Sequence, residues 1–117
     1  MWKVCRELRI SLTNLIKCLP GAEKYRLADQ IIRAARSVTN NIAEGYGRFH
    51  FQENMQFCRQ SRGSLYELMD HLQICLDEGY IKSDTYGQYR DECLRCIQLI
   101  NGYIRFISKQ KGISDGK

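Results

Sequence analysis

Apolar residues recur every three or four positions in four successive stretches of the chain, which is the spacing of one face of an α-helix. The first stretch covers residues 2–19, and the Pro20-Gly21 pair that follows it is typical of a helix end. The second covers residues 24–44, with Gly45 expected as its C-terminal stop. Charged and polar residues fill the opposite faces, so both stretches predict amphipathic helices.

The third and fourth stretches, residues 51–78 and 83–109, read as heptad seams. Residues 110–117 hold two glycines and are expected to fray. One seam position of the third stretch is charged, at Arg62. A guanidinium there is costly unless it is paired, so we expect Arg62 to meet an acidic or amide side chain on a facing helix. The third seam consists of Phe51, Met55, Cys58, Arg62, Leu65, Met69, Leu72 and Leu76.

These four helices predict one all-α domain spanning residues 1–117. A single proline leaves long helices uninterrupted, and loops of a few residues place successive helices antiparallel. The predicted architecture is therefore an up-down-up-down antiparallel four-helix bundle. No apolar run approaches the roughly 20 residues that span a bilayer, and the first residues lack the pattern of a secretory signal. We therefore expect a cytoplasmic protein that does not contact a membrane.

The second predicted helix ends in an unusually polar sequence, SVTNNIAEGYGR. Several of its polar residues advance by three or four positions and therefore line one helical face. Because buried charge requires paired partners, we interpret this face as a structural network that fixes the second and third helices, with a ligand site as the alternative. The predicted network consists of Arg33, Ser37, Asn41, Glu44 and Arg62.

The sequence does not determine which polar side chains of this region pair with which arginine. Glu44 or Asn41 could reach Arg62, or either could reach Arg48, across the short turn that joins the two helices. Gly45 and Gly47 are expected to supply the positive backbone angles of that turn.

The charge of the chain is moderately basic, +5 in net, and unevenly distributed. Residues 1–62 hold 11 Lys and Arg against 5 Asp and Glu, whereas residues 63–117 hold 7 against 8. Such asymmetry permits a nucleic-acid or other polyanion partner, although a basic half is often only a solvated surface that keeps a protein soluble. The candidate phosphate contacts are Lys3, Arg6, Arg9, Arg26, Arg36, Arg48 and Arg59.

Cysteine is frequent, with six residues, but the pattern does not predict a metal centre. Cys93 and Cys96 form a CxxC pair, and a structural zinc site needs a second pair of Cys or His at matching spacing. His50 and His71 stand alone. We therefore expect reduced, metal-free cysteines, most of which fill core or near-core positions. Templates for phosphate-binding loops, nucleophile elbows and zinc proteases are absent, so we assign no catalytic residue and no cofactor.

The polar helix end also carries a resemblance to a known family. The chain resembles the four-helix-bundle proteins encoded in intervening sequences of bacterial large-subunit ribosomal RNA genes, often labelled ribosomal protein-like. The accessory protein of diversity-generating retroelements is similar in outline. The matching residues are Gln30, Arg33-Ala34-Ala35, Ser37-Val38, Asn41-Ile42-Ala43-Glu44-Gly45, Gly47-Arg48, Phe57, Arg62-Gly63-Ser64-Leu65, Glu67 and Gly79-Tyr80-Ile81.

The resemblance implies a bundle that assembles as a homopentameric ring, without enzymatic activity and with a nucleic-acid-associated role. Two functions therefore compete. The first is an oligomeric module that binds RNA, or DNA, through a basic surface. The alternative is a structural adaptor for a protein partner such as a reverse transcriptase, with nucleic acid incidental.

Overall fold

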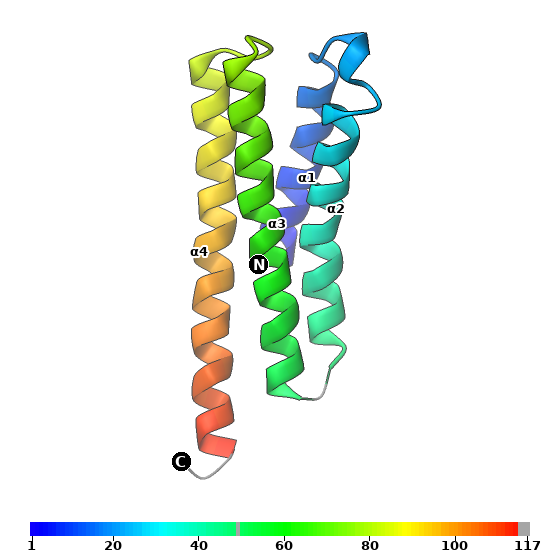
Figure 1. Ribbon diagram of the computed structural model, residues 1–117. Helices are drawn as coiled ribbons and strands as arrows, with labels where there is room; N and C mark the ends of the chain where they lie inside the picture. The colour runs from blue at the N-terminus through cyan, green and yellow to red at the C-terminus, as the bar shows by residue number, and fades with distance from the viewer. Residues whose placement is uncertain (49, 115–117) are drawn as a thin grey trace.

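The chain folds into four long antiparallel helices (Figure 1). The computed structural model describes residues 1–48 and 50–114, and these contain no β-strand. A short 3₁₀-helix, η1, lies between the first two helices. The elements are α1 (Trp2–Ile16), η1 (Gly21–Glu23), α2 (Leu27–Tyr46), α3 (Phe51–Asp77) and α4 (Ser83–Ser114). The predicted all-α four-helix fold is confirmed for the described residues.

Each helix packs beside its neighbours in the chain, and α1 also touches α4, so α2 and α4 lie diagonally across the bundle. The α1–α2 and α3–α4 connections share one end, while the α2–α3 turn lies at the other (Figure 1). The molecule is elongated, with extents of 55 × 24 × 19 Å. Helix α4 is the longest, and its C-terminal part runs past the α2–α3 turn (Figure 1).

A single apolar core fills the space between the helices. Leu12, Ile31, Leu65, Leu68 and Ile100 are almost completely buried and come from all four helices. Burial of each such side chain stabilises the fold by roughly 1.5–3 kcal/mol. None of the described helices contains a segment long and apolar enough to span a bilayer.

The cysteines occupy the packing positions that the sequence predicted, with one exception. Five are buried in the core, and Cys18 is exposed. All six are free thiols. The buried cysteines are Cys5, Cys58, Cys75, Cys93 and Cys96.

Two predicted helix boundaries, one on each side of η1, differ from the observed ones. Helix α1 ends at Ile16 rather than near Leu19, since the amides of Cys18 and Leu19 bond to carbonyls three residues back and tighten the chain before Pro20. Helix α2 starts at Leu27 rather than Lys24, because η1 occupies the preceding residues. The hydroxyl of Tyr80 donates to Glu23 of η1 at 3.0 Å, a contact from the opposite half of the chain that helix periodicity does not reveal.

The fourth helix extends beyond its predicted end at residue 109. Helix α4 continues to Ser114, and residues 115–117 lie outside the described residues. One glycine in a helix interior costs only about 1 kcal/mol relative to alanine. Gly112 is therefore too weak a breaker to end a helix whose preceding turn is anchored by the buried Ile107.

Candidate nucleic-acid interface

The α2–α3 junction is built around a buried glycine, Gly45, in the last turns of α2. A Cβ at this position would lie 2.6 Å from Oδ1 of Asn54 and 3.3 Å from Cβ of Phe57. Gly45 is therefore a packing residue that lets α2 and α3 approach closely, and the prediction that it stops the helix is wrong. The helix continues to Tyr46, and Gly47 follows as its C-cap.

The glycines of this turn do not adopt the predicted positive angles. Gly47 has φ −79°, in the ordinary helical region. Among the described residues, only Gly79, between α3 and α4, has a positive φ, of 75°. The described residues of the α2–α3 turn therefore have ordinary backbone conformations, and Gly45 is required because a larger side chain would not fit there.

Part of the predicted polar network joins α2 to α3. The side-chain amide of Asn41 donates to the carbonyl of Ser37 at 2.8 Å and to its Oγ at 3.0 Å. The hydroxyl of Ser64, on α3, donates to Ser37 Oγ at 2.8 Å. Nearby, the buried Ser61 donates to the carbonyl of Val38 at 2.8 Å. These bonds fix the register of the two helices.

The charged members of the predicted network lie elsewhere. Arg33 pairs with Asp29 at 3.0 Å on the exposed side of α2. Glu44 pairs with Arg48 at 3.1 Å, and this guanidinium also lies 3.9 Å from Glu53 and 5.0 Å above the ring of Phe57. The structure therefore separates Arg33 and Glu44 from the Ser37–Asn41–Ser64 cluster, and the five predicted residues do not form one network.

Arg62 meets an amide partner on a facing helix, as the sequence predicted. Its Nη1 donates to Oδ1 of Asn101, on α4, at 2.7 Å. Of the partners left open from sequence, Glu44 reaches Arg48 and not Arg62. The described residues contain no buried ion pair at this seam position, since Asn101 is neutral and Arg62 is half-buried.

Replacing Glu44 with Ala is expected to change the free energy of unfolding by no more than about 0.5 kcal/mol, as is usual for an exposed ion pair. The side chains of Glu44 and Arg48 are 60% and 43% exposed, so water solvates either charge when the other is removed. Urea melts of Glu44→Ala beside the wild-type protein measure this difference. A loss of several kcal/mol would show that Glu44 has a buried partner after all.

The charges of the chain separate along the long axis of the bundle. We call the end that holds the α2–α3 turn the basic end; it comprises residues 1–10, 36–48, 50–64 and 95–110. These segments carry ten Lys and Arg against three Asp and Glu. The other end, residues 11–35 and 65–94, carries six against nine. Hydrogen bonds between helices hold the segments of the basic end together, from Arg9 to Thr39 at 2.8 Å and from Arg62 to Asn101.

Six of the seven predicted phosphate contacts lie at the basic end. Arg26 is the exception, because it sits beside η1 at the opposite end and pairs with Glu23 at 3.1 Å. Arg9 and Arg48 already contact Thr39 and Glu44. The remaining four are exposed, and none of them makes an ion pair within the described part of the chain. They are Lys3, Arg6, Arg36 and Arg59.

Sequence reasoning missed three cations of this surface, Arg95, Arg105 and Lys109. All three are exposed on α4, Arg95 near its middle and the other two closer to its C-terminal end. The division of the chain at residue 62 placed them in a segment of net negative charge, and the acidic residues of that segment within the described part of the chain lie at the other end of the bundle. These cations can be identified from sequence if charged residues are counted separately for the two ends of each predicted helix. The antiparallel order then shows which helix ends lie together.

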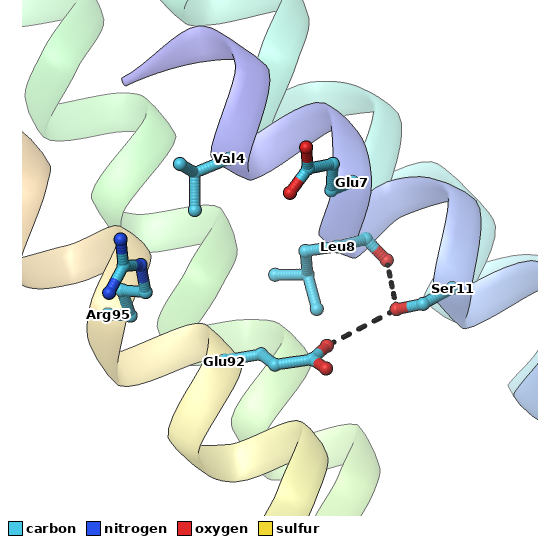
Figure 2. Close-up of a pocket in the computed structure, with 6 residues that line it drawn as sticks. All are labelled: Val4, Glu7, Leu8, Ser11, Glu92 and Arg95. Atoms are coloured by element: carbon cyan, nitrogen blue, oxygen red, sulfur yellow. Dashed lines mark hydrogen bonds between the residues drawn. The ribbon is translucent and has the colours of Figure 1, made fainter.

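Two pockets border the basic end. An open pocket of about 650 Å³ lies beside the α2–α3 turn and is lined by Asn40, Ala43, Glu44, Gly47 and Arg48. The other, of about 440 Å³, lies between α1 and α4 (Figure 2).

The pocket between α1 and α4 contains two carboxylates and one hydroxyl. Figure 2 shows Ser11 between the Leu8 carbonyl, at 3.0 Å, and Oε2 of Glu92, at 3.2 Å. Glu7 and Arg95 also line it, but no histidine does. The lining contains no imidazole, which is the usual general base for a serine nucleophile.

The thiols between α1 and α4 have shifted acidities. A hydrogen bond between the thiols of Cys5 and Cys96 lowers the pKa of Cys5 and raises the pKa of Cys96. Burial raises the pKa of Cys93 to about 12. Within the described residues no group of three or more His, Cys, Asp or Glu is placed to hold a metal ion.

These features define the class of the molecule: an all-α four-helix bundle with a tightly packed α2–α3 junction and a basic end. The chain belongs to the 23S rRNA-intervening sequence protein family, whose family model matches residues 1–102. This confirms the resemblance carried by the α2–α3 sequence.

A solved structure shares the fold. It is the 1.70 Å crystal structure of a protein with unknown function from the S23 ribosomal protein family of Bacteroides thetaiotaomicron VPI-5482. The TM-score is 0.81 at 19% sequence identity, covering 88% of this chain and 96% of that chain. At this identity the likeness concerns the fold alone. The comparison with curated proteins gave no match.

Proposed function

We propose that this chain is a non-enzymatic, homo-oligomeric module that binds RNA through the basic end of the bundle. The observation that carries the proposal is the separation of charge along the bundle axis, with ten cationic residues against three anionic ones at one end. Lysine and arginine that contact phosphates release bound counterions, which supplies most of the free energy of sequence-independent binding. The basic end has no element shaped to read base edges, so we expect little preference for sequence.

The absence of an enzymatic role is part of the proposal. Support comes from the polar groups of the family motif, which are engaged in structural contacts: Asn41 with Ser37, and Glu44 with Arg48. In the pocket between α1 and α4, no histidine accompanies the Ser11 hydroxyl and the carboxylates of Glu7 and Glu92, so the residues of a serine–histidine–carboxylate triad are not assembled there.

The homopentameric ring implied by the family resemblance is also proposed for this chain. In a ring each basic end is repeated about the axis, so modest attraction at one site becomes strong through multivalency. Multi-angle light scattering measures the number of chains per particle. We expect five, and a monomer would contradict the ring.

The proposed function predicts different effects for charge reversals at the two ends. Arg36→Glu combined with Arg59→Glu is expected to weaken binding to a hairpin RNA by at least about tenfold. The slope of log affinity against log salt concentration should also be shallower by about two for this variant, because roughly one phosphate contact is lost with each cation. Both side chains are exposed, so the fold should be retained. Fluorescence anisotropy across a salt titration measures both quantities.

The matched control reverses two exposed cations at the other end, Lys82→Glu with Arg90→Glu. It makes the same change in net charge, so long-range repulsion is equal while the basic end is untouched. Equal losses in the two variants would contradict a localised interface. Failure of the wild-type chain to bind RNA or DNA even at about 50 mM salt, where phosphate-dominated binding is strong, would favour the adaptor function instead.

One observation favours the adaptor alternative. A groove beside the α1–α2 connection has an apolar floor that includes Ile16, Leu19 and Ile32, and Tyr25 on its rim is 82% exposed. Lysines at its rim would suit an acidic helix of a protein partner. The charge-reversal pair separates the two functions, since neither variant alters this apolar floor.

A further inference from the structure

Three aromatic side chains cluster at the basic end, where α2 ends and α4 continues. The rings of Tyr103 and Phe106 lie nearly parallel, at 10° with centroids 6.4 Å apart. Tyr46, the last residue of α2, meets Tyr103 edge-on at 86° and 5.5 Å. We call Tyr46, Tyr103 and Phe106 the aromatic shelf.

The shelf is open to solvent to an unusual degree for aromatic residues. Tyr46 is 51% exposed and Phe106 is 52% exposed. In Figure 1, α1 does not extend as far toward this end as the other three helices do. The bundle therefore has three helices at this level, and part of the aromatic surface that a fourth helix could cover faces water.

The shelf is also held in place rather than free to collapse. The side-chain amide of Asn54, a buried residue of α3, donates to the hydroxyl of Tyr103 at 3.0 Å. Asn54 itself packs against Gly45. The family motif thus supports the central ring of the shelf, since the close approach at Gly45 positions Asn54.

The charge beside the shelf suits a polyanion. Arg105 and Lys109 are exposed on the same turns of α4 as Tyr103 and Phe106, and residues 95–110 contain no acidic residue. Burial raises the pKa of Tyr46, with the neighbouring Tyr103 adding to the effect. Tyr46 therefore remains neutral at physiological pH and adds no negative charge beside a phosphate.

We propose that the aromatic shelf stacks the unpaired nucleobases of single-stranded RNA segments, while the surrounding cations contact their phosphates. Every base has a π-face, so aromatic platforms beside basic grooves bind single strands with little regard to sequence. The inference rests on the proposed RNA-binding function and adds a preference for unpaired over paired RNA. Bases within a duplex are stacked on one another and cannot lie on the shelf.

The test compares two RNA probes of equal length and phosphate number, one a hairpin with a long unpaired loop and the other a blunt duplex. Wild-type protein is expected to bind the looped probe more tightly. Phe106→Leu keeps an apolar side chain of similar volume but removes the flat ring, and should weaken binding to the looped probe by roughly tenfold. Duplex binding and its salt dependence should not change. Phe106→Trp keeps a ring and should preserve the loop preference.

Two outcomes would overturn the shelf while leaving the proposed function intact. One is equal binding of both probes by the wild-type protein with no effect of Phe106→Leu. The other is a change in the number of chains per particle in Phe106→Leu, measured by light scattering, which would show that a second copy covers the shelf. Binding of neither probe by the wild-type protein would overturn both proposals together. Thermal melts check that each variant is folded, as expected for a side chain that is half exposed.

Discussion

Raising the pH above about 9 is expected to lower the free energy of unfolding by several kcal/mol. Burial raises the pKa of Cys58 and Cys75 from 9.0 to about 11, and that of Cys93 to about 12. In the unfolded chain these thiols regain their ordinary pKa. Between pH 9 and pH 11 the unfolded state therefore loses protons that the folded state keeps, and stability falls as pH rises.

The size of this effect follows from the shifts. One pKa unit corresponds to about 1.4 kcal/mol, so the shifts correspond to at most about 3 kcal/mol each for Cys58 and Cys75 and about 4 kcal/mol for Cys93. Together they approach the whole stability of a typical domain, which is about 5–15 kcal/mol. Below pH 9 the thiols are protonated in both states, and their contribution to stability is fully present.

Urea melts at a series of pH values, with a reducing agent present, measure how the free energy of unfolding changes with pH. Cys93→Ala is the informative variant, because it removes one titrating thiol from the core. Its free energy of unfolding should fall less steeply than that of the wild-type protein, by about 1.4 kcal/mol per pH unit above pH 9. Parallel curves for the two proteins would mean that this thiol does not ionise on unfolding, and would contradict the prediction.

The four helices could be predicted because each buries one apolar stripe whose period is visible in the sequence. The partner class of Arg62 could be predicted as well, since a seam position faces another helix and a buried guanidinium needs a polar acceptor there. The particular acceptor, Asn101, could not be chosen from sequence. The choice depends on the axial register of α3 relative to α4, which is determined by side-chain packing.

The errors have related physical causes. The start of α2 depends on η1, which is tied down by Tyr80 from the far half of the chain. The role of Gly45 depends on which residue of α3 lies opposite it, so a packing glycine and a helix stop look identical in sequence. The basic end forms because antiparallel packing brings charged residues of α1 and α4 beside those of α2 and α3. A count of charges along the chain does not take this packing into account.

Placing a side chain at Gly45 is expected to destabilise the protein by about 3 kcal/mol for Gly45→Val, at the upper end of the usual cost of overpacking a core. The added Cβ alone would lie 2.6 Å from Asn54 Oδ1 and 3.3 Å from Phe57 Cβ, and the two methyl groups of valine add further volume. Asn54 could rotate away, but it would then lose its hydrogen bond to Tyr103. The Cβ of Phe57 is attached directly to the backbone of α3, so a rotation of the Asn54 side chain does not relieve the contact with Phe57.

Gly63→Val is the matched control, because it makes the same chemical change within α3. A Cβ at Gly63 would meet nothing within 4 Å, and the residue is exposed. Valine has a somewhat better helix propensity than glycine, so the free energy of unfolding should stay within about 0.5 kcal/mol of wild type or rise slightly. Chemical melts of the two variants compare the sites directly, and similar losses at both would indicate a general intolerance of valine in these helices rather than a close approach at Gly45.

The same substitution links the family motif to the proposed RNA site. If Gly45→Val displaces Asn54, Tyr103 loses the donor that holds its ring, so the aromatic shelf should loosen even where the protein remains folded. Binding of the looped RNA should then weaken more than binding of the duplex, as in Phe106→Leu. Loss of stability without any change in the ratio of the two affinities would show that Asn54 keeps its position and that Gly45 serves helix packing alone.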